Sequence, residues 1–281
     1  MIRRLLLAAV ALLAAASLAA GLWLSRLFSE PGAVAVASLA GALGAKRVLG
    51  VFAHPDDEQL VTGLFVRAKT HDAAFTALVT ATEGDAGEQA PVIARQRDLG
   101  SVRKAELLKN GFALGIDEQE VWAYPDGSVP DVPLEELVAR IEQALRSYRP
   151  DLVVTFWPAS GATGHADHMR VGLATEAAVK RVRSAPAPEY AGPHWIAFAL
   201  TPRKALARLG GESGRFVAEH SPDPTHRMPG EVSAKRRGWK IHASQEDYVR
   251  QAYGVPAWLL YLLWDEEVYR VVDLDEGLSR H

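Results

Sequence analysis

Short apolar segments alternate along the chain with longer stretches of helical periodicity. The apolar segments are rich in β-branched and aromatic residues, and this composition is typical of strands buried in a sheet. We expect five such strands, at Arg47–Phe52, Ala73–Thr82, Glu120–Tyr124, Asp151–Phe156 and Trp195–Leu200.

The stretches between these strands carry the apolar spacing of amphipathic helices. Helices are predicted at Pro55–Thr70, Pro91–Leu114, Pro133–Tyr148, His165–Arg183 and Lys235–Gln245. Alternation of strands and helices predicts an α/β fold with a Rossmann-like, mostly parallel sheet and helices on both faces. No Gly-x-Gly-x-x-Gly motif follows the first strand, so a dinucleotide cofactor is not indicated.

An uncharged apolar run from Leu5 to Leu24 follows Arg3 and Arg4. As a helix of about 30 Å, this run just spans a bilayer core. A cleaved signal peptide and a retained membrane anchor both fit, and the arginines favour an N-terminus inside the cell. The rest of the chain is therefore expected outside the cytoplasm, either anchored or exported. We divide the chain into an anchor or signal peptide (1–28), a linker (29–45) and one domain (46–281).

The charge balance limits the classes of partner and site. The chain has 31 Lys and Arg residues against 34 Asp and Glu residues, a formal net charge of −3, and no basic tract. Nucleic-acid binding is therefore not indicated. The absence of cysteine excludes disulfide bonds and thiolate ligands. A metal site in this chain must use His, Asp or Glu side chains.

The first predicted strand leads into one imidazole and three carboxylates, His54-Pro55-Asp56-Asp57-Glu58. Pro55 ends strand pairing and is favoured in the first turn of a helix. We expect a helix to begin there, with the acidic residues in its first turn and with His54 and Asp57, three positions apart, on one face. That spacing suits two ligands of one metal ion.

A second cluster, His165-Ala166-Asp167-His168, follows the fourth predicted strand and opens a helix. The carboxyl ends of parallel strands meet at one edge of a sheet, so the two clusters are expected to converge. Imidazoles and carboxylates packed together are costly unless a cation joins them. A metal site is therefore predicted where the clusters meet.

Several of these features also have structural explanations. His-Pro-Asp-Asp alone fits a solvated turn with a helix cap. The segment His220–His226 holds two more histidines, but its prolines predict a surface loop rather than a second metal site. His242 is interpreted either as a buried structural histidine or as a partner of groups that touch the metal. The stretch Val255–Trp264 is interpreted as core, with contact to a bilayer as the alternative.

Together the two clusters, Ala53 to Glu58 and His165 to His168, resemble the paired signature of the PIG-L/LmbE family of zinc-dependent N-deacetylases. Further segments similar to this family are Thr82-Glu83-Gly84 with Gly87-Glu88, Arg103-Lys104-Ala105-Glu106, Tyr124-Pro125-Asp126-Gly127, and Lys235 with His242-Ala243-Ser244-Gln245. The resemblance extends over residues 47–270. It departs from the family pattern at Asp85-Ala86, which separates Gly84 from Gly87.

The resemblance implies a ligand set and a mechanism. His54, Asp57 and His168 would bind Zn²⁺, or another first-row divalent ion, through two imidazoles and one carboxylate. Asp56 would accept the proton of the attacking water. His165, as an imidazolium, would stabilise the oxyanion and protonate the leaving amine. Asp167 would hold this imidazolium in place.

Two further residues are candidates for binding the substrate. Asp126, in the turn after the third strand, is expected to accept hydrogen bonds from sugar hydroxyls, with ordinary turn chemistry as the alternative. Arg103 would bind a polar or anionic group, although a solvated helix face is the simpler explanation. The reaction implied is removal of the N-acetyl group from an N-acetylglucosamine-type sugar. The group that carries this sugar, such as inositol, phosphatidylinositol or malate, is not indicated.

Two other functions are compatible with the pattern. Two histidines and one carboxylate also form the facial triad of non-haem iron oxygenases, although the additional Asp56 counts against this class. A surface sugar-binding protein with an inactive site would lack a ligand or the base, and none is missing here. The expected partners are an N-acetyl sugar and a membrane, which the N-terminal segment would contact.

Overall fold

The computed structural model describes residues 2–278, so Met1 and residues 279–281, at the ends of the predicted divisions 1–28 and 46–281, lie outside the described residues. One eight-stranded sheet forms its centre, in the order β1-β7-β8-β6-β5-β2-β3-β4. The strands are β1 (Val34–Ala35), β2 (Arg47–Phe52), β3 (Phe75–Thr82), β4 (Glu118–Tyr124), β5 (Leu152–Phe156), β6 (Trp195–Leu200), β7 (His226–Pro229) and β8 (Glu266–Asp273). All described pairs are parallel except those that β8 makes with β6 and β7. The predicted mostly parallel sheet is confirmed.

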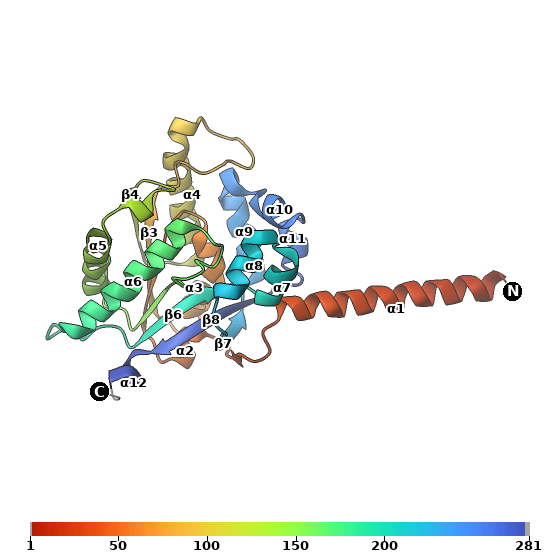
Figure 1. Ribbon diagram of the computed structural model, residues 1–281, viewed down its shortest axis with the longest axis horizontal. Helices are drawn as coiled ribbons and strands as arrows, with labels where there is room; N and C mark the ends of the chain where they lie inside the picture. The colour runs from red at the N-terminus through yellow and green to blue at the C-terminus, as the bar shows by residue number, and fades with distance from the viewer. Residues whose placement is uncertain (1, 279–281) are drawn as a thin grey trace.

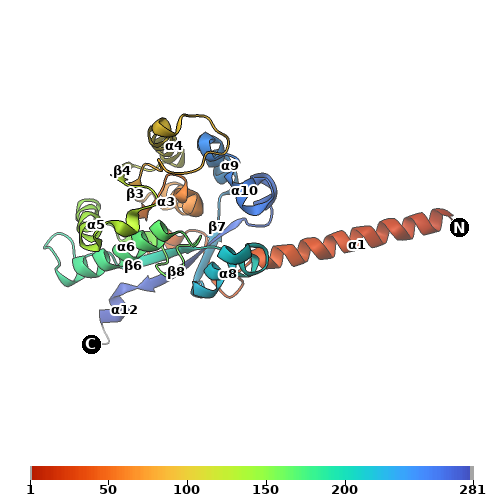
Figure 2. The same ribbon diagram turned by 45° about the horizontal axis from the view of Figure 1, so that its top comes forward.

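Helices cover both faces of the sheet, as predicted (Figure 1). In Figure 2, α3 and α4 lie with α9 on one side, whereas α5 and α6 pack together on the other. The helices are α1 (Ile2–Phe28), α2 (Leu39–Ala42), α3 (Thr62–Thr70), α4 (Leu99–Leu114), α5 (Leu134–Tyr148), α6 (Ala166–Ser184), α7 (Arg203–Leu209), α8 (Gly211–His220), α9 (Val232–Ile241), α10 (Tyr248–Tyr253), α11 (Ala257–Leu260) and α12 (Leu274–Leu278).

The strand order reverses between β2 and β5. From β2 the chain moves outward through β3 to β4, and from β5 it moves in the opposite direction to β6. In open α/β sheets, the helices on the two sides of such a reversal leave a crevice at the carboxyl ends of the strands, where ligands bind. The two polar clusters of the sequence follow these two strands.

Two helices begin later than the sequence predicted. The chain after Pro55 forms a short 3-10 helix, Asp57–Val61, before α3 starts. The stretch from Pro91 is a loop, and α4 begins only at Leu99. Gln89 Oε1 accepts the backbone N–H of Ile93 at 3.0 Å and of Ala94 at 2.9 Å. Because the side chain satisfies these donors locally, this segment has less need of helical hydrogen bonds.

Part of the predicted linker, residues 29–45, belongs to the folded domain. β1 pairs in parallel with β7, and α2 buries Leu39 and Ala40 completely. This part of the predicted linker therefore packs against the core. The strands β7 and β8, which extend the sheet beyond β6, were not predicted from the sequence.

The N-terminal helix α1 projects from the domain (Figure 1). Its segment Ala9–Phe28 is long and apolar enough to cross a membrane, and it is the one such helix among residues 2–278. Leu27 and Phe28 at its end are only 4% and 8% exposed, because they join an apolar cluster that includes Trp239, Leu260 and Trp264. The last turn of α1 is thus a part of the domain rather than a flexible connection.

A buried ion pair ties α9 to the sheet and to α3. Lys235 Nζ lies 2.8 Å from Glu267 Oε1, and both side chains are almost completely buried. The Glu267 carboxylate also accepts the backbone N–H of Gly63 at 2.7 Å and of Leu64 at 3.0 Å, at the start of α3. It therefore satisfies two helix donors that have no partner within the helix.

Replacing Lys235 by methionine is expected to lower the free energy of unfolding by about 3–5 kcal/mol, because it leaves the Glu267 carboxylate buried without its cation. Urea unfolding followed by tryptophan fluorescence measures this change. The double variant Lys235→Met/Glu267→Gln is the matched control and is expected to recover part of the loss. A loss below about 1 kcal/mol in the single variant, the size of an exposed pair, would contradict this role.

Candidate metal centre and active site

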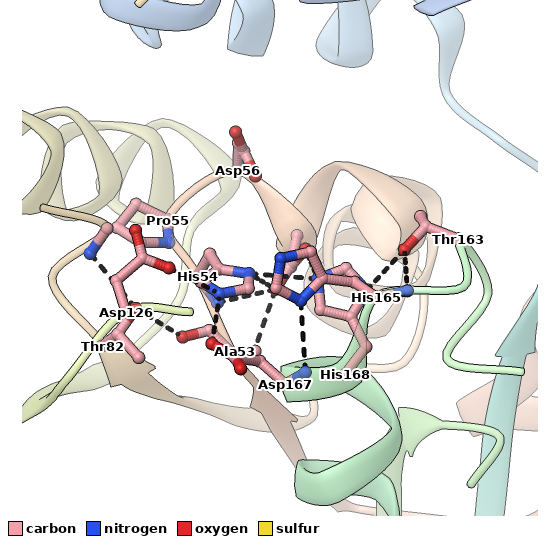
Figure 3. Close-up of polar contacts among 12 residues, drawn as sticks. Ala53, His54, Pro55, Asp56, Thr82, Asp126, Thr163, His165, Asp167 and His168 are labelled. Carbon is pink, nitrogen blue, oxygen red and sulfur yellow. Dashed lines mark hydrogen bonds and ion pairs between the residues drawn. The ribbon is translucent and has the colours of Figure 1, made fainter. Parts of the chain in front are cut away.

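The two polar clusters meet at the carboxyl ends of β2 and β5 (Figure 3). His54 follows β2 directly, and His168 lies in the first turn of α6, which His165 caps. The ring of His168 stacks on Phe156 at the end of β5, with centroids 4.1 Å apart. This contact fixes the plane of the imidazole. The predicted convergence of the clusters is therefore seen in the structure.

His54 and Asp57 converge for a reason that differs from the predicted one. His54 precedes the 3-10 helix, so the two residues do not share a regular helical face. Instead, Asp57 Oδ2 accepts the backbone N–H of Ala53 at 3.1 Å and of His54 at 2.7 Å. This turn folds the Asp57 carboxylate back toward the His54 ring.

Three donor atoms from His54, Asp57 and His168 surround one point. His54 Nδ1 lies 3.0 Å from His168 Nε2 and 3.6 Å from Asp57 Oδ2, and His168 Nε2 lies 3.2 Å from Asp57 Oδ1. Ligands bound at about 2.1 Å in a tetrahedron lie about 3.4 Å from one another. The spacing of these atoms therefore fits a shared metal ion.

The other nitrogen of each imidazole has an oxygen acceptor. His54 Nε2 lies 3.0 Å from Asp126 Oδ1 and 3.1 Å from Asp167 Oδ2. His168 Nδ1 lies 2.9 Å from the Gly161 carbonyl oxygen. With protons on these nitrogens, both facing nitrogens present lone pairs, and such an arrangement orients metal-binding histidines. Two lone pairs 3.0 Å apart repel, so a cation or a proton must lie between them.

The charged groups around His54 also favour a cation or a proton at this point. Burial lowers the pKa of His54, but hydrogen bonds to Asp126 and Asp167 and the charge of Asp57 raise it to about 10. Burial opposes ionisation of Asp57, yet the two histidines hold its pKa well below the usual range. The pocket therefore favours positive charge at the point where the three donor atoms meet.

Two sets of side chains without Asp57 have donor atoms that all lie within 4.8 Å of one another, namely His54-His165-His168 and His54-Asp126-Asp167. The second set uses His54 Nε2, whose hydrogen bonds to carboxylates explain it without a metal. The first lacks a carboxylate to balance the charge of the ion. We therefore favour His54, Asp57 and His168. Neither His220 nor His226 belongs to any such set among residues 2–278; His220 instead stacks on Phe216.

The Asp56 side chain lies to one side of His54 and His168 and takes no part in these contacts (Figure 3). Its φ of 99° is left-handed, so a backbone turn, rather than rotation around a helix, separates its side chain from that of Asp57. Such a conformation is strained for aspartate and is typical of functional sites. Arg103 Nη2 donates to Asp56 Oδ2 at 3.1 Å, and the Asp56 N–H donates to Glu58 Oε2 at 3.0 Å. These two contacts hold the carboxylate in place.

Burial raises the pKa of Asp56 to about 6; Arg103 opposes this shift and Asp57 adds to it. A carboxylate with a pKa near neutrality is mostly ionised at pH 7 and is a stronger base than ordinary aspartate. Asp56 thus has the properties of a general base.

Sequence reasoning missed the buried network behind Asp56. Glu58 is 1% exposed, and its Oε1 accepts from Asn110 Nδ2 at 2.6 Å and also contacts His242 Nε2. His242 is completely buried, as expected of a structural histidine. It is also linked to Asp56 indirectly, because Glu58 contacts both residues. The sequence shows Glu58 within the first cluster. Its partners, Asn110 on α4 and His242 at the end of α9, lie far away in the sequence.

The expected partnership of Asp167 with His165 is wrong. The Asp167 carboxylate accepts from Gly127 N at 2.8 Å and contacts His54, while only its backbone N–H reaches His165 Nδ1, at 3.2 Å. Asp167 therefore orients His54. His165 is exposed, and desolvation on its cavity side together with His168 and His54 lowers its pKa. The imidazolium form, in which His165 was expected to stabilise the oxyanion and protonate the amine, is thus disfavoured.

Arg103 and Asp126, the predicted substrate-binding residues, line the cavity but are also engaged by the protein. Arg103 is 5% exposed rather than part of a solvated face, and it donates to the carbonyls of Pro55 at 2.7 Å and Gly84 at 2.9 Å. A Cβ at Gly87 would lie 2.3 Å from Arg103 Nη1, so this glycine leaves room for the guanidinium. Asp126 Oδ2 accepts from Ala86 N at 3.0 Å, which ties the inserted Asp85-Ala86 segment to the site.

A cavity of about 460 Å³ opens over these residues. Its floor holds three histidines (His54, His165 and His168), three aspartates (Asp56, Asp57 and Asp126) and Arg103, and its wall is aromatic, formed by Trp239, Tyr248, Tyr253, Tyr261 and Trp264. The volume is in the range of sites for small molecules. The cavity can therefore place a sugar-sized ligand on the polar floor.

Comparison with known proteins agrees with the resemblance seen in the sequence. The PIG-L family pattern, described as GlcNAc-PI de-N-acetylase, matches residues 49–179. The chain is 33% identical to 1D-myo-inositol 2-acetamido-2-deoxy-alpha-D-glucopyranoside deacetylase of Corynebacterium urealyticum, over 71% of each chain. It is 31% identical to the Kineococcus radiotolerans protein of the same name, over 81% of this chain and 77% of the relative.

The fold is also shared with solved structures. N,N'-diacetylchitobiose deacetylase from Pyrococcus horikoshii superposes with a TM-score of 0.61 at 19% identity, over 86% of this chain and 92% of that protein. At this identity the likeness concerns the fold. The relatives of similar sequence carry the information on activity.

Proposed function

Since the chain belongs to the PIG-L family of de-N-acetylases and is a deacetylase for N-acetylglucosamine-type sugars, we propose that His54, Asp57 and His168 hold the metal ion of this reaction. The observation that carries the proposal is the convergence of His54 Nδ1, His168 Nε2 and the Asp57 carboxylate within 3.0–3.6 Å. Two imidazoles and one carboxylate suit Zn²⁺, and other first-row divalent ions bind the same donors. A bound ion supplies a Lewis acid that polarises the amide carbonyl and acidifies the attacking water.

The side chains of the cavity supply the remaining steps. Asp56, held in place by Arg103 and Glu58, accepts a proton of the attacking water and then gives it to the amine nitrogen as the C–N bond breaks. Asp167 keeps the Nε2 proton on His54. His165 is the N-cap of α6, and its ring centroid lies 4.8 Å from that of His54. As a neutral imidazole it donates a hydrogen bond to the oxyanion.

The rival functions are not supported. The relatives are deacetylases, and one cavity is lined by His54, Asp56, Asp57, His165 and His168. An oxygenase triad also gives no role to Asp56. A binding protein without activity has no need of a strained aspartate beside the donor set.

We further propose that the substrate is an N-acetylglucosaminyl glycoside with a polar carrier. The names of the relatives make the inositol glycoside the first compound to test. Purified full-length chain loaded with Zn²⁺ is incubated with a panel of N-acetylated glycosides, and free amine and acetate are measured in equal amounts. The variant His54→Ala is the matched blank. Absence of amine release from every glycoside by the metal-loaded protein would overturn the proposed chemistry.

The N-terminal helix is proposed to be a retained anchor for one catalytic domain outside the cytoplasm. Burial of Leu27 and Phe28 supports retention, and Arg3 and Arg4 support an inward N-terminus. A reporter active only in the cytoplasm, fused after His281 beyond the described residues, is expected to be silent in intact cells. Strong reporter activity would reverse the orientation.

A further inference from the structure

The catalytic domain is fixed to the end of α1. Leu24 lines the same apolar region as Leu27 and Phe28, and the Arg203 N–H donates to Glu30 Oε1 at 3.2 Å just beyond the helix. An apolar run of about 30 Å ending near Leu24 uses the whole thickness of a bilayer core. If α1 crosses the membrane, as proposed above, the part of the domain beside Leu24 must lie at the membrane surface.

The elements at that position are α7, α10 and α11, which gather at the end of the domain from which α1 emerges (Figures 1 and 2). Four large apolar side chains are exposed there: Leu209 (57%), Trp258 (53%), Leu259 (37%) and Leu262 (67%). We call these four residues the docking face. Leu260, Tyr261 and Trp264 of the same stretch are buried, so the predicted core segment 255–264 is core on one side only.

A second cavity, of about 390 Å³, opens between α1 and the docking face. Its lining is almost entirely apolar and includes Leu24, Phe28, Leu206, Leu259 and Leu263. Its polar side-chain groups are those of Thr201, Tyr253 and Trp264, and the Thr201 hydroxyl already donates to the Ala162 carbonyl oxygen at 3.0 Å. Because the rest of the lining is apolar, hydrocarbon is the chemistry that fits the cavity.

Three exposed cations lie on α1 and α7, two helices of this region. Arg26 at the end of α1 and Lys204 and Arg208 on α7 are exposed, and none of the three forms an ion pair with another described residue. Basic side chains beside an apolar surface are attracted to anionic lipid headgroups. Trp23 on α1 is 52% exposed and lies at the end of the apolar run. In a membrane, the ends of such a run lie at the membrane–water interface, where aromatic residues are enriched.

We propose that the docking face rests on the bilayer that α1 crosses, with hydrocarbon chains of its lipids in the second cavity and anionic headgroups beside Arg26, Lys204 and Arg208. The occupant is lipid because the cavity begins on α1 itself and continues the apolar surface of that helix. Tyr253 and Trp264 line both cavities, so the metal-site cavity lies directly behind the docked surface. The metal site would therefore be held close to the membrane surface.

The absence of cysteine makes single-site labelling direct. Leu262→Cys reports on the docking face, Leu259→Cys on the second cavity, Leu13→Cys on exposed α1, and Ala139→Cys on exposed α5 at the far end of the domain. Each full-length variant carries a nitroxide and is reconstituted into phosphatidylcholine vesicles with or without phosphatidylglycerol. Collision with O₂, which concentrates in lipid, is compared with collision with a water-soluble nickel complex.

Labels at 259 and 262 are expected to favour O₂ as the label at 13 does, whereas the label at 139 favours nickel. Phosphatidylglycerol should strengthen the O₂ preference at 262, and Lys204→Glu/Arg208→Glu should remove that increase. Nickel preference at 262 with O₂ preference at 13 would overturn docking and leave the anchor intact. Nickel preference at 13 would overturn both, without bearing on deacetylation of soluble glycosides. Shielding of 262 from both reagents would assign the face to a second copy of the chain and overturn the lipid proposal.

Discussion

Asp56→Asn is expected to lower kcat by ~10²–10⁴-fold while the metal content stays unchanged. Asparagine keeps an oxygen for the hydrogen bond from Arg103 and the N–H that donates to Glu58, but it cannot take a proton from water. Because Asp56 is not a proposed ligand, the ion remains. KM should change little when substrate binding is in rapid equilibrium.

The measurement for this variant is kcat alongside metal content by elemental analysis. Asp85→Asn is the matched control, since Asp85 is an exposed carboxylate on the neighbouring loop, and it should retain normal turnover. A near-normal kcat in metal-loaded Asp56→Asn would assign the base to another group, with His165 as the next candidate.

Asp57→Asn is expected to fail in a different way, through loss of metal. The substitution removes the one anionic donor from the proposed set. If the asparagine oxygen accepts the N–H groups of Ala53 and His54, its NH2 group faces His168 Nε2 and cannot bind a cation. Loss of an outer partner of a metal ligand weakens binding by about 10–100-fold, and loss of a ligand itself should exceed that range. Activity falls because the site is empty, so excess Zn²⁺ should restore part of it.

Competition with a zinc-binding dye measures the affinity of this variant. Glu88→Gln, which changes another carboxylate of the cavity wall, is the control and should bind metal normally. Normal zinc affinity in Asp57→Asn together with metal loss in Asp56→Asn would mean that the roles of the two aspartates are exchanged.

The sequence predicted those parts of the fold that depend on local pattern. The parallel strands β2, β3, β5 and β6 are largely apolar runs because both of their faces are covered by helices. Their order along the chain brings the residues after β2 and β5 to one edge, so the meeting of His54 with His168 was predictable. β1 is only two residues long and carries no such signal.

Other features depend on contacts between distant segments. The pairing of Glu58 with His242 and the burial of Arg103 among backbone carbonyls have no local periodicity that would reveal them. The left-handed turn at Asp56 departs from the conformation that an aspartate ordinarily adopts. Local preference gives way here to the geometry of the site, as it commonly does at functional residues.

The orientation of Asp167 illustrates the same limit. Its position beside His165 in sequence suggested a pair, but residue 167 lies in the first turn of α6 and its side chain points across the crevice to His54. Only the spatial approach of β2 to β5 makes that contact. The sequence identified Asp167 as a residue of the site, but its contact with His54 could be seen only in the folded structure.

Metal titration of the purified full-length chain tests the central claim most directly. The protein is stripped with a chelator, its metal content is checked, and release of amine from an N-acetylglucosaminyl glycoside is measured as Zn²⁺ is added. Activity is expected to be absent at first, to rise linearly, and to level off at about one equivalent per chain, because three donors form one site. In His168→Ala the same titration should show no break. Full turnover by the metal-free chain would contradict the assignment of a metal-dependent deacetylase site to His54, Asp57 and His168.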